Sequence, residues 1–173
     1  MPSPDDQIQL IQECLRAELG AADAAGHRLV ENHDPTNEPY ADYRVVHEIV
    51  VEPLALDQLR IEFWVTDDGA VSVGLERRSR VAKFTGVKTS ARNIFIAGHE
   101  PVFVSPEYVR QLVDLAANGA FEARGRVAFG RLTWVKLHTP SGTILPPEVA
   151  RRLHPIPLLV PIGRQFRFRY RPW

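Results

Sequence analysis

Residues 61–76 contain the pattern that most restricts the fold, because it is typical of a β-hairpin. A large apolar residue occupies every second position over residues 61–65 and again over residues 71–75. Asp68 and Gly69 stand between these segments. An Asp-Gly pair favours the type I′ turn, in which both central residues have a positive φ. The sequence therefore predicts two antiparallel strands joined by a type I′ turn.

Two amphipathic helices are expected on either side of this hairpin in the sequence. Residues 5–25 repeat apolar side chains at helical spacing, and Ser3 with Pro4 before them is typical of a helix start. Residues 106–118 follow the same pattern, with Ser105 as the expected capping residue. The second helix should bury an apolar stripe formed by Val109, Leu112, Val113 and Ala116.

The remaining apolar runs predict further strands linked by short turns, which favours antiparallel pairing over parallel units. We expect these strands at residues 43–52, 93–97, 121–129, 132–138 and 164–171, with a short helix at 146–153. The prediction is one α+β domain over residues 1–173. A mainly antiparallel β-sheet of five to seven strands would carry the two main helices on one face. Its flexible segments would be residues 1–4 and 31–42, and residues 77–92 would form a basic insert.

The order of helix, three strands, helix, two strands and helix is similar to that of the type III secretion chaperones. This resemblance lies in the order of the elements and implies a chaperone-like role.

The two parts of the chain carry opposite charge, although the net charge is zero. Residues 1–76 hold 16 acidic and 4 basic side chains, whereas residues 77–173 hold 5 acidic and 17 basic ones. Such asymmetry predicts either a basic face for nucleic acid or an acidic partner, or pairing of the two parts across the fold. We favour pairing as the more general explanation, because one compact domain brings both parts close together.

Cations concentrate in two segments of the basic part. Residues 77–92 contain six cations and no acid, and arginines alternate with aromatic residues over 164–171. On a strand, that alternation turns the aromatic residues toward the core and the arginines outward. Trp64 falls on the polar side of the hairpin, where it is either covered by a helix or exposed as an aromatic anchor. The expected partner-binding residues are Trp64, Arg77, Arg78, Arg80, Lys83, Lys88, Arg92, Arg167, Arg169 and Arg171.

No standard motif for a metal or cofactor is present. His27, Glu31, His33 and Asp34 lie close together in the sequence, but their spacing matches no zinc motif. Cys14 lies in the apolar pattern of the first helix and is expected to be a buried, inert thiol. We therefore expect no metal and no cofactor.

Catalysis would have to use a histidine and a carboxylate as a general base. His47-Glu48 and His99-Glu100 are two such dipeptides, but neighbouring residues on a strand point to opposite faces. Neither dipeptide therefore forms its own pair. A pair between strands, such as His99 with Glu48, stays open at this point.

We expect a non-catalytic protein that binds another protein through oppositely charged surface zones, as an adaptor, a chaperone-like protein or a toxin-neutralising partner. Nucleic-acid binding through residues 77–92 and the C-terminal arginines is one alternative, and an enzyme with a histidine–carboxylate pair is another. The acidic N-terminus lacks the apolar core of a secretory signal, and no long apolar run is present. We therefore expect a cytoplasmic protein without membrane association. Arginine outnumbers lysine 18 to 3, which favours a bacterial origin.

Overall fold

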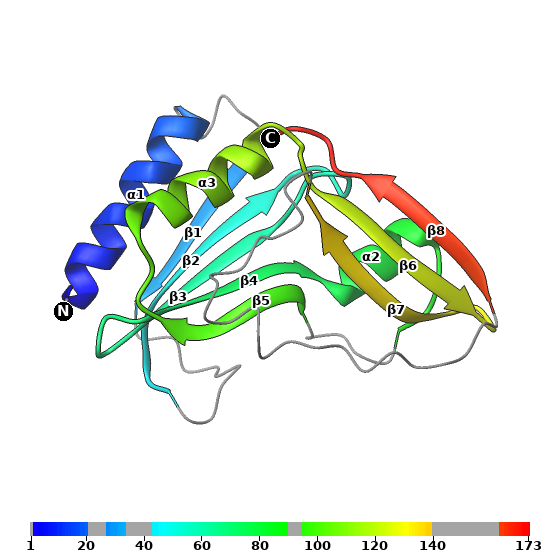
Figure 1. Ribbon diagram of the computed structural model, residues 1–173, viewed down its shortest axis with the longest axis horizontal. Coiled ribbons are helices and arrows are strands. Elements are labelled where there is room, and N and C mark those ends of the chain that lie inside the picture. The colour runs from blue at the N-terminus through cyan, green and yellow to red at the C-terminus, as the bar shows by residue number, and fades with distance from the viewer. Residues whose placement is uncertain (1, 21–26, 34–42, 90–94, 140–162) are drawn as a thin grey trace.

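The computed structural model of the chain describes residues 2–20, 27–33, 43–89, 95–139 and 163–173 (Figure 1). Its elements, in chain order, are α1 (Pro4–Leu19), β1 (His27–His33), β2 (Val45–Pro53), β3 (Ile61–Thr66), β4 (Val71–Arg77), α2 (Arg78–Thr85), β5 (Phe95–Val102), α3 (Pro106–Ala117), β6 (Glu122–Ala128), β7 (Arg131–His138) and β8 (Arg164–Arg169).

The strands are antiparallel and are divided between two sheets, so the predicted α+β fold is confirmed. The larger sheet has five strands in the order β1-β2-β3-β4-β5, and the smaller has three in the order β7-β6-β8. One continuous sheet does not form, because α3 follows β5 and the next strands pair with one another instead. The helix expected at 146–153 lies outside the described residues.

The two main helices pack side by side on one face of the larger sheet, as predicted (Figure 1). From α1, Ile11 and Leu15 are fully buried in the same core as Phe63 of β3. From α3, the four residues of the predicted apolar stripe are all buried. The capping hydroxyls are also found, since Ser3 accepts a bond from Asp6 N and Ser105 accepts one from Tyr108 N. These helices begin where their caps predict.

The hairpin at residues 61–76 is confirmed, but its predicted type I′ turn is wrong. Gly69 has a φ of 82°, whereas Asp68 does not have a positive φ. Gly69 N donates to Thr66 O, and Thr66 N donates to Ala70 O, which makes a three-residue loop with a glycine bulge. The Asp68 carboxylate accepts bonds from Thr66 Oγ1 and Ala70 N. These bonds hold Asp68 in place and favour this loop over the tighter one.

A type I′ turn occurs instead between β6 and β7. Ala128 pairs with Arg131, and the two residues between them, Phe129 and Gly130, have φ values of 51° and 68°. Left-handed backbone conformation costs a residue with a side chain roughly 1–2 kcal/mol. Asparagine or aspartate is the usual first residue of such a turn, so a phenylalanine here is unexpected.

Two elements were not predicted. Residues 27–33 form β1, so the polar loop expected for residues 31–42 is wrong for 31–33. Residues 34–42 lie outside the described part of the chain. The basic insert at 77–92 contains α2, which has no side-chain cap and no acid in its first turn. Because the usual start signals are missing, the sequence pattern did not reveal this helix.

Helix α2 covers the inner face of the smaller sheet. Its buried residues Val81 and Ala82 pack with Leu132 of β7 and with Phe166 and Phe168 of β8. The predicted alternation of β8 is confirmed, because Phe166 and Phe168 lie inward while Arg167 and Arg169 are exposed. The inner face of the smaller sheet is therefore apolar, and its outer face carries the charged residues.

Candidate partner-binding face

Two of the expected partner-binding residues, Arg77 and Arg80, are turned toward buried carboxylates. Arg77 Nε and Nη2 each donate to Glu62 at 2.8 Å, and Arg80 Nε donates to Glu76 Oε1 at 2.8 Å. Glu62 and Glu76 are 0% and 1% exposed. They lie on the sheet face opposite to α1 and α3, since they alternate with Ile61, Phe63, Val73 and Leu75 of the helix-covered core.

Two further residues complete this ion cluster. Arg60 Nε donates to Glu62 Oε1 at 2.6 Å, and its Nη1 donates to Glu52. Arg80 Nη1 reaches Glu52 at 3.2 Å. Three carboxyl groups and three guanidinium groups thus form one cluster. It pairs acids of the first part of the chain with Arg77 and Arg80 of the second part, as the charge asymmetry predicts, and also with Arg60 of the first part.

Glu76 is the unusual member of the ion cluster. Its φ of 50° is left-handed, and its Oε2 is buried without a hydrogen bond of normal geometry. The hydroxyl of Tyr170 nearby is in the same situation. Burial raises the pKa of Glu76 to about 7, although the charge of Arg80 opposes this shift. Burial, and then the charge of Glu76, raises the pKa of Tyr170 well above its ordinary value.

The side chains of Arg78 and Trp64 also form hydrogen bonds within the fold. Arg78 Nη2 donates to the carbonyl oxygens of Leu132 and Thr133. Trp64 is 3% exposed, so the exposed alternative for this residue is wrong. Its Nε1 donates to Glu48, and the ring of Phe95 lies edge-on to it at 5.0 Å. A partner has no direct access to Trp64 in this structure.

The other expected residues are spread over different places. Lys83 and Lys88 are exposed on α2 and just after it, and Arg92 lies outside the described residues. Arg171 is exposed and lies 3.4 Å from Asp57. Arg167 and Arg169 are exposed on β8. Of the expected partner-binding residues, these two lie next to further cations on the neighbouring strands.

These cations cover the outer face of the smaller sheet, which we call the basic sheet face. Its register places three cations in one row across the strands, Lys136 of β7 beside Arg124 of β6 beside Arg167 of β8. The neighbouring rows are His138–Glu122–Arg169 and Trp134–Arg126–Gln165. Like charges directly opposite each other on a sheet destabilise it. The row of three cations therefore lowers the stability of the sheet unless other groups compensate for it.

Glu122 moderates the charge of the basic sheet face. Its carboxylate accepts a bond from Arg167 Nε at 2.6 Å and another from Arg124. Burial raises the pKa of Glu122, but the hydrogen bonds from Arg124 and Arg167 outweigh this and hold the pKa below its usual value. In the described rows of this face, one carboxylate thus lies among five cations, namely Arg124, Arg126, Lys136, Arg167 and Arg169.

His138 reports the positive potential of this face. Burial is the first cause that lowers its pKa, and the charge of Arg124 is the second. Lys136 and Arg167 lower it further, whereas Glu122 opposes them. The neutral imidazole is therefore favoured, and the cations of all three strands act on one point of the surface.

The sequence indicated only part of this face. The arginines of β8 were found from their alternation with aromatic residues. Arg124 and Arg126 showed the same alternation in residues 121–129, and Lys136 lies in a predicted strand. What was missing was the pairing of β6 with β8, because it joins residues that are 37 to 47 positions apart in the sequence, from Val127 with Arg164 to Glu122 with Arg169. The alternation in each strand indicated which cations face outward. Only the order of the strands in the sheet showed that these cations lie side by side.

A histidine–carboxylate pair is present, but not the one considered from the sequence. His47 Nε2 lies 3.0 Å from Glu31 Oε2, and Glu31 also accepts a bond from Gln12 of α1. Glu48 accepts bonds from Asn32 and Trp64, and the side chain of His99 lies outside the described part of the structure. His47 is only 3% exposed, and its contacts link α1 to the edge of the sheet. An enzymatic role for this pair stays a prediction.

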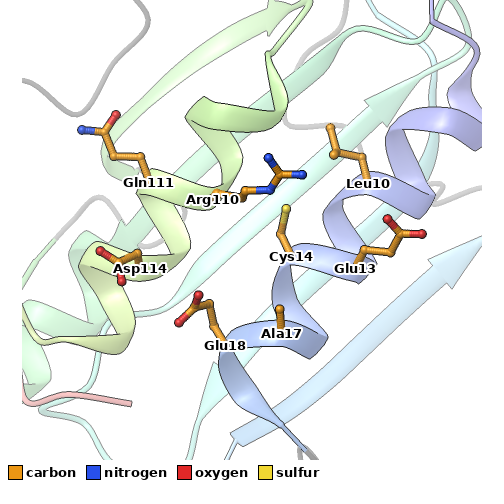
Figure 2. Close-up of a pocket in the computed structure, with 8 residues that line it drawn as sticks. All are labelled: Leu10, Glu13, Cys14, Ala17, Glu18, Arg110, Gln111 and Asp114. Carbon is orange, nitrogen blue, oxygen red and sulfur yellow. The ribbon is translucent and has the colours of Figure 1, made fainter.

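A groove of about 400 Å³ runs between α1 and α3 (Figure 2). Figure 2 shows Cys14 of α1 beside the guanidinium group of Arg110 of α3, with carboxylates around them. Burial raises the pKa of Cys14, although Arg110 opposes this shift. The raised pKa favours the neutral thiol of Cys14. Because the thiolate is the reactive form, Cys14 is a poor nucleophile.

Within the described residues, no three histidine, cysteine or carboxylate side chains gather as metal ligands do. The helices in this part of the chain also lack the length and apolar character needed to cross a bilayer.

Comparison of the chain with protein-family models, with curated proteins and with solved structures found no significant match. The observed order of elements also differs from the order of helix, three strands, helix, two strands and helix, because β1, α2, β5 and β8 are additional.

Replacement of Glu62 by glutamine should strongly destabilise the fold, because Arg60 and Arg77 would lose a buried anionic partner. We expect the free energy of unfolding, measured by urea denaturation, to fall by about 3 kcal/mol. The control is Asp57→Ala, which breaks an exposed pair and should change it by at most about 1 kcal/mol. Equal effects of the two variants would contradict a structural role for the ion cluster.

Glu76 should make stability depend on pH. Its pKa is 4.5 in the unfolded chain and about 7 in the folded protein, so the folded protein holds the extra proton between these values. Its contribution to stability is therefore complete below pH 4.5 and is lost as the pH rises to about 7. Glu76→Gln should remove this pH dependence. Relative to the wild type, its free energy of unfolding should rise by on the order of 3 kcal/mol over that interval. Urea denaturation below and above the interval measures it, and a constant difference between the proteins would contradict it.

The cations of the basic sheet face should determine the pKa of His138. Lys136→Gln removes one cation and should raise that pKa, whereas Glu122→Gln removes an opposing acid and should lower it further. An NMR pH titration of the imidazole, assigned with a His138→Gln variant, gives both values. Arg110→Gln changes a distant charge and should leave the titration unchanged. Shifts in the same direction for the two main variants would show that this face has no such field.

Proposed function

We propose that this chain is a small cytoplasmic, non-catalytic bacterial protein that binds an acidic partner protein through the basic sheet face. The observation that supports this most strongly is the row Lys136–Arg124–Arg167, in which three cations are adjacent across three strands. Its two arginines are 45% and 68% exposed at their side chains. Carboxylates of a partner could therefore reach them.

The row is not needed to hold the smaller sheet together. The inner face already supplies apolar contacts, since Ala123 is fully buried and Leu137 and Phe168 pack against the same core. The mutual repulsion of the outer cations reduces the stability that these contacts provide. An acidic ligand would relieve that repulsion, so part of its binding energy would come from removing an unfavourable interaction of the free protein.

Glu122 favours a protein partner over nucleic acid. Its carboxylate lies between Arg124 and Arg167, where the phosphates of a nucleic acid would approach a fixed negative charge. A protein can present an amide or a cation to Glu122 and carboxylates to the arginines around it. Bidentate pairing of arginine with carboxylate would then give orientation as well as affinity.

Single-stranded nucleic acid is the second candidate, because of the row Trp134–Arg126–Gln165. In this register, Trp134 is the backbone partner of Arg126 on the neighbouring strand, so an aromatic residue and a cation pair across β6 and β7. Proteins that bind single strands combine a basic surface with aromatic residues on which bases stack. The two candidates therefore make different predictions for one set of binding measurements.

Binding to a poly-glutamate peptide and to a single-stranded DNA oligonucleotide should separate them. We expect the full chain to bind poly-glutamate, with an affinity that falls as salt rises. The triple variant Arg124→Gln, Lys136→Gln, Arg167→Gln should weaken this binding at least about tenfold at low salt. Fluorescence anisotropy of labelled probes over a salt series measures both effects.

The matched control is the triple variant Arg16→Gln, Arg44→Gln, Arg110→Gln, which removes the same charge from exposed positions elsewhere. It should retain binding close to that of the wild type. Equal losses in the two triple variants would mean that net charge alone attracts the probe, and the proposal would fail. Tighter binding of the oligonucleotide, lost in the first variant only, would establish nucleic acid as the ligand.

A further inference from the structure

The turn between β6 and β7 carries an aromatic side chain that makes little contact with its own chain. Phe129 is 90% exposed, the largest exposure among the large apolar residues of the described chain. Figure 1 shows this turn at the end of the molecule far from α1 and α3. Packing within the described fold therefore does not explain why a phenylalanine occupies this position.

Backbone conformation also disfavours phenylalanine there. Its φ of 51° is left-handed, which is uncommon for a bulky residue, whereas asparagine adopts this conformation more readily. A large apolar side chain in water brings no compensating burial. Both the turn and the solvent thus favour a small polar residue. A role in contact with another molecule explains the phenylalanine better than a role in folding does.

The turn is held in place by the segment that follows α2. Lys88 N donates to Gly130 O at 2.9 Å, and Leu132 N donates to Lys88 O at 3.0 Å. These bonds place the turn against a second segment, so Phe129 is presented on an ordered support. A side chain that is positioned in advance loses less conformational freedom on binding.

Exposed cations surround this turn. Arg131 follows it directly, Lys88 is bonded to it through the backbone, and Arg164 opens β8 opposite Val127. The turn also joins β6 and β7, which carry Arg124, Arg126 and Lys136 on the basic sheet face. The aromatic side chain thus lies on the turn that joins two of the three strands of the basic sheet face.

We propose that Phe129 is the apolar anchor of the partner interface. This role rests on the function proposed above. It would enter an apolar depression of an acidic partner protein, while carboxylates around that depression pair with Lys88, Arg131 and Arg164. Charge complementarity selects a protein that combines apolar and acidic groups. Aromatic residues surrounded by a polar rim are typical of the residues that contribute most to such interfaces.

Two peptides of equal length test this proposal with the full chain. One is poly-glutamate, and the other is poly-glutamate with a central block of leucine and phenylalanine. The wild type should bind the second peptide more tightly. Phe129→Asn should weaken that binding about tenfold and leave binding of plain poly-glutamate unchanged. Phe129→Trp keeps an aromatic anchor and should retain the preference for the apolar block.

The stability of the asparagine variant shows whether a loss of peptide binding comes from misfolding. Because asparagine suits the left-handed turn, its urea midpoint should equal or exceed that of the wild type. Weaker binding by a protein of equal or greater stability then identifies Phe129 as a contact residue. An unchanged preference for the apolar block in Phe129→Asn would overturn the proposal.

Two other outcomes separate this proposal from its premise. If poly-glutamate fails to bind the wild type, or binds independently of Arg124, Lys136 and Arg167, the proposed function itself fails. Vesicles of phosphatidylserine and phosphatidylcholine form the last comparison. If Phe129→Asn reduces binding to these vesicles but not to the apolar acidic peptide, the anchor is directed to an anionic lipid surface and the protein-partner proposal is overturned.

Discussion

The ion cluster around Glu62 and Glu76 is the interaction on which the larger sheet depends. The carboxylate of Glu62 has no solvent exposure and is tolerated because Arg60 and Arg77 donate to it, while Glu76 accepts a bond from Arg80. A shift of one residue in the pairing of β3 would move Glu62 to the apolar face under α1 and α3, where it would have no cation. We infer that the cluster selects the register of the hairpin as well as contributing to stability. It also ties the start of α2 to the sheet, since Arg80 lies on that helix.

The same cluster shows where opposite charges of the described residues meet, and the basic sheet face lies apart from it. Strands β1 to β4 come from the acidic part of the chain, whereas β6, β7 and β8 all come from the basic part. Arg77 and Arg80 are neutralised where the two parts meet. The smaller sheet has no acidic strand beside it in its own hydrogen-bonded order, so Glu122 is the one carboxylate in the rows that the register defines. Separation of charge along the sequence thus becomes separation of charge in space.

Two described residues other than glycine have a left-handed backbone, Glu76 and Phe129. One is buried beside Tyr170 and the other is exposed at a turn, so they differ in what could compensate the strain. The contacts of Glu76 with Arg80 and Arg77 lie within the fold. Phe129 has no comparable burial. Strained residues often mark functional sites, and here the contrast directs attention to the turn and the basic sheet face.

Local patterns were sufficient for the hairpin, for both main helices with their caps, and for the inward and outward sides of β8. Each depends on neighbours in the sequence, such as alternation in a strand or a serine before a helix. The turn type at Asp68 was not decided locally, because side-chain bonds from Thr66 and Ala70 favour the longer loop. Tertiary structure alone determined that Arg77 and Arg80 are neutralised while Arg124 and Lys136 join Arg167. Those outcomes depend on which distant strands pair, and the hydrogen bonds and buried contacts that choose strand partners are not visible in the alternation of any single strand.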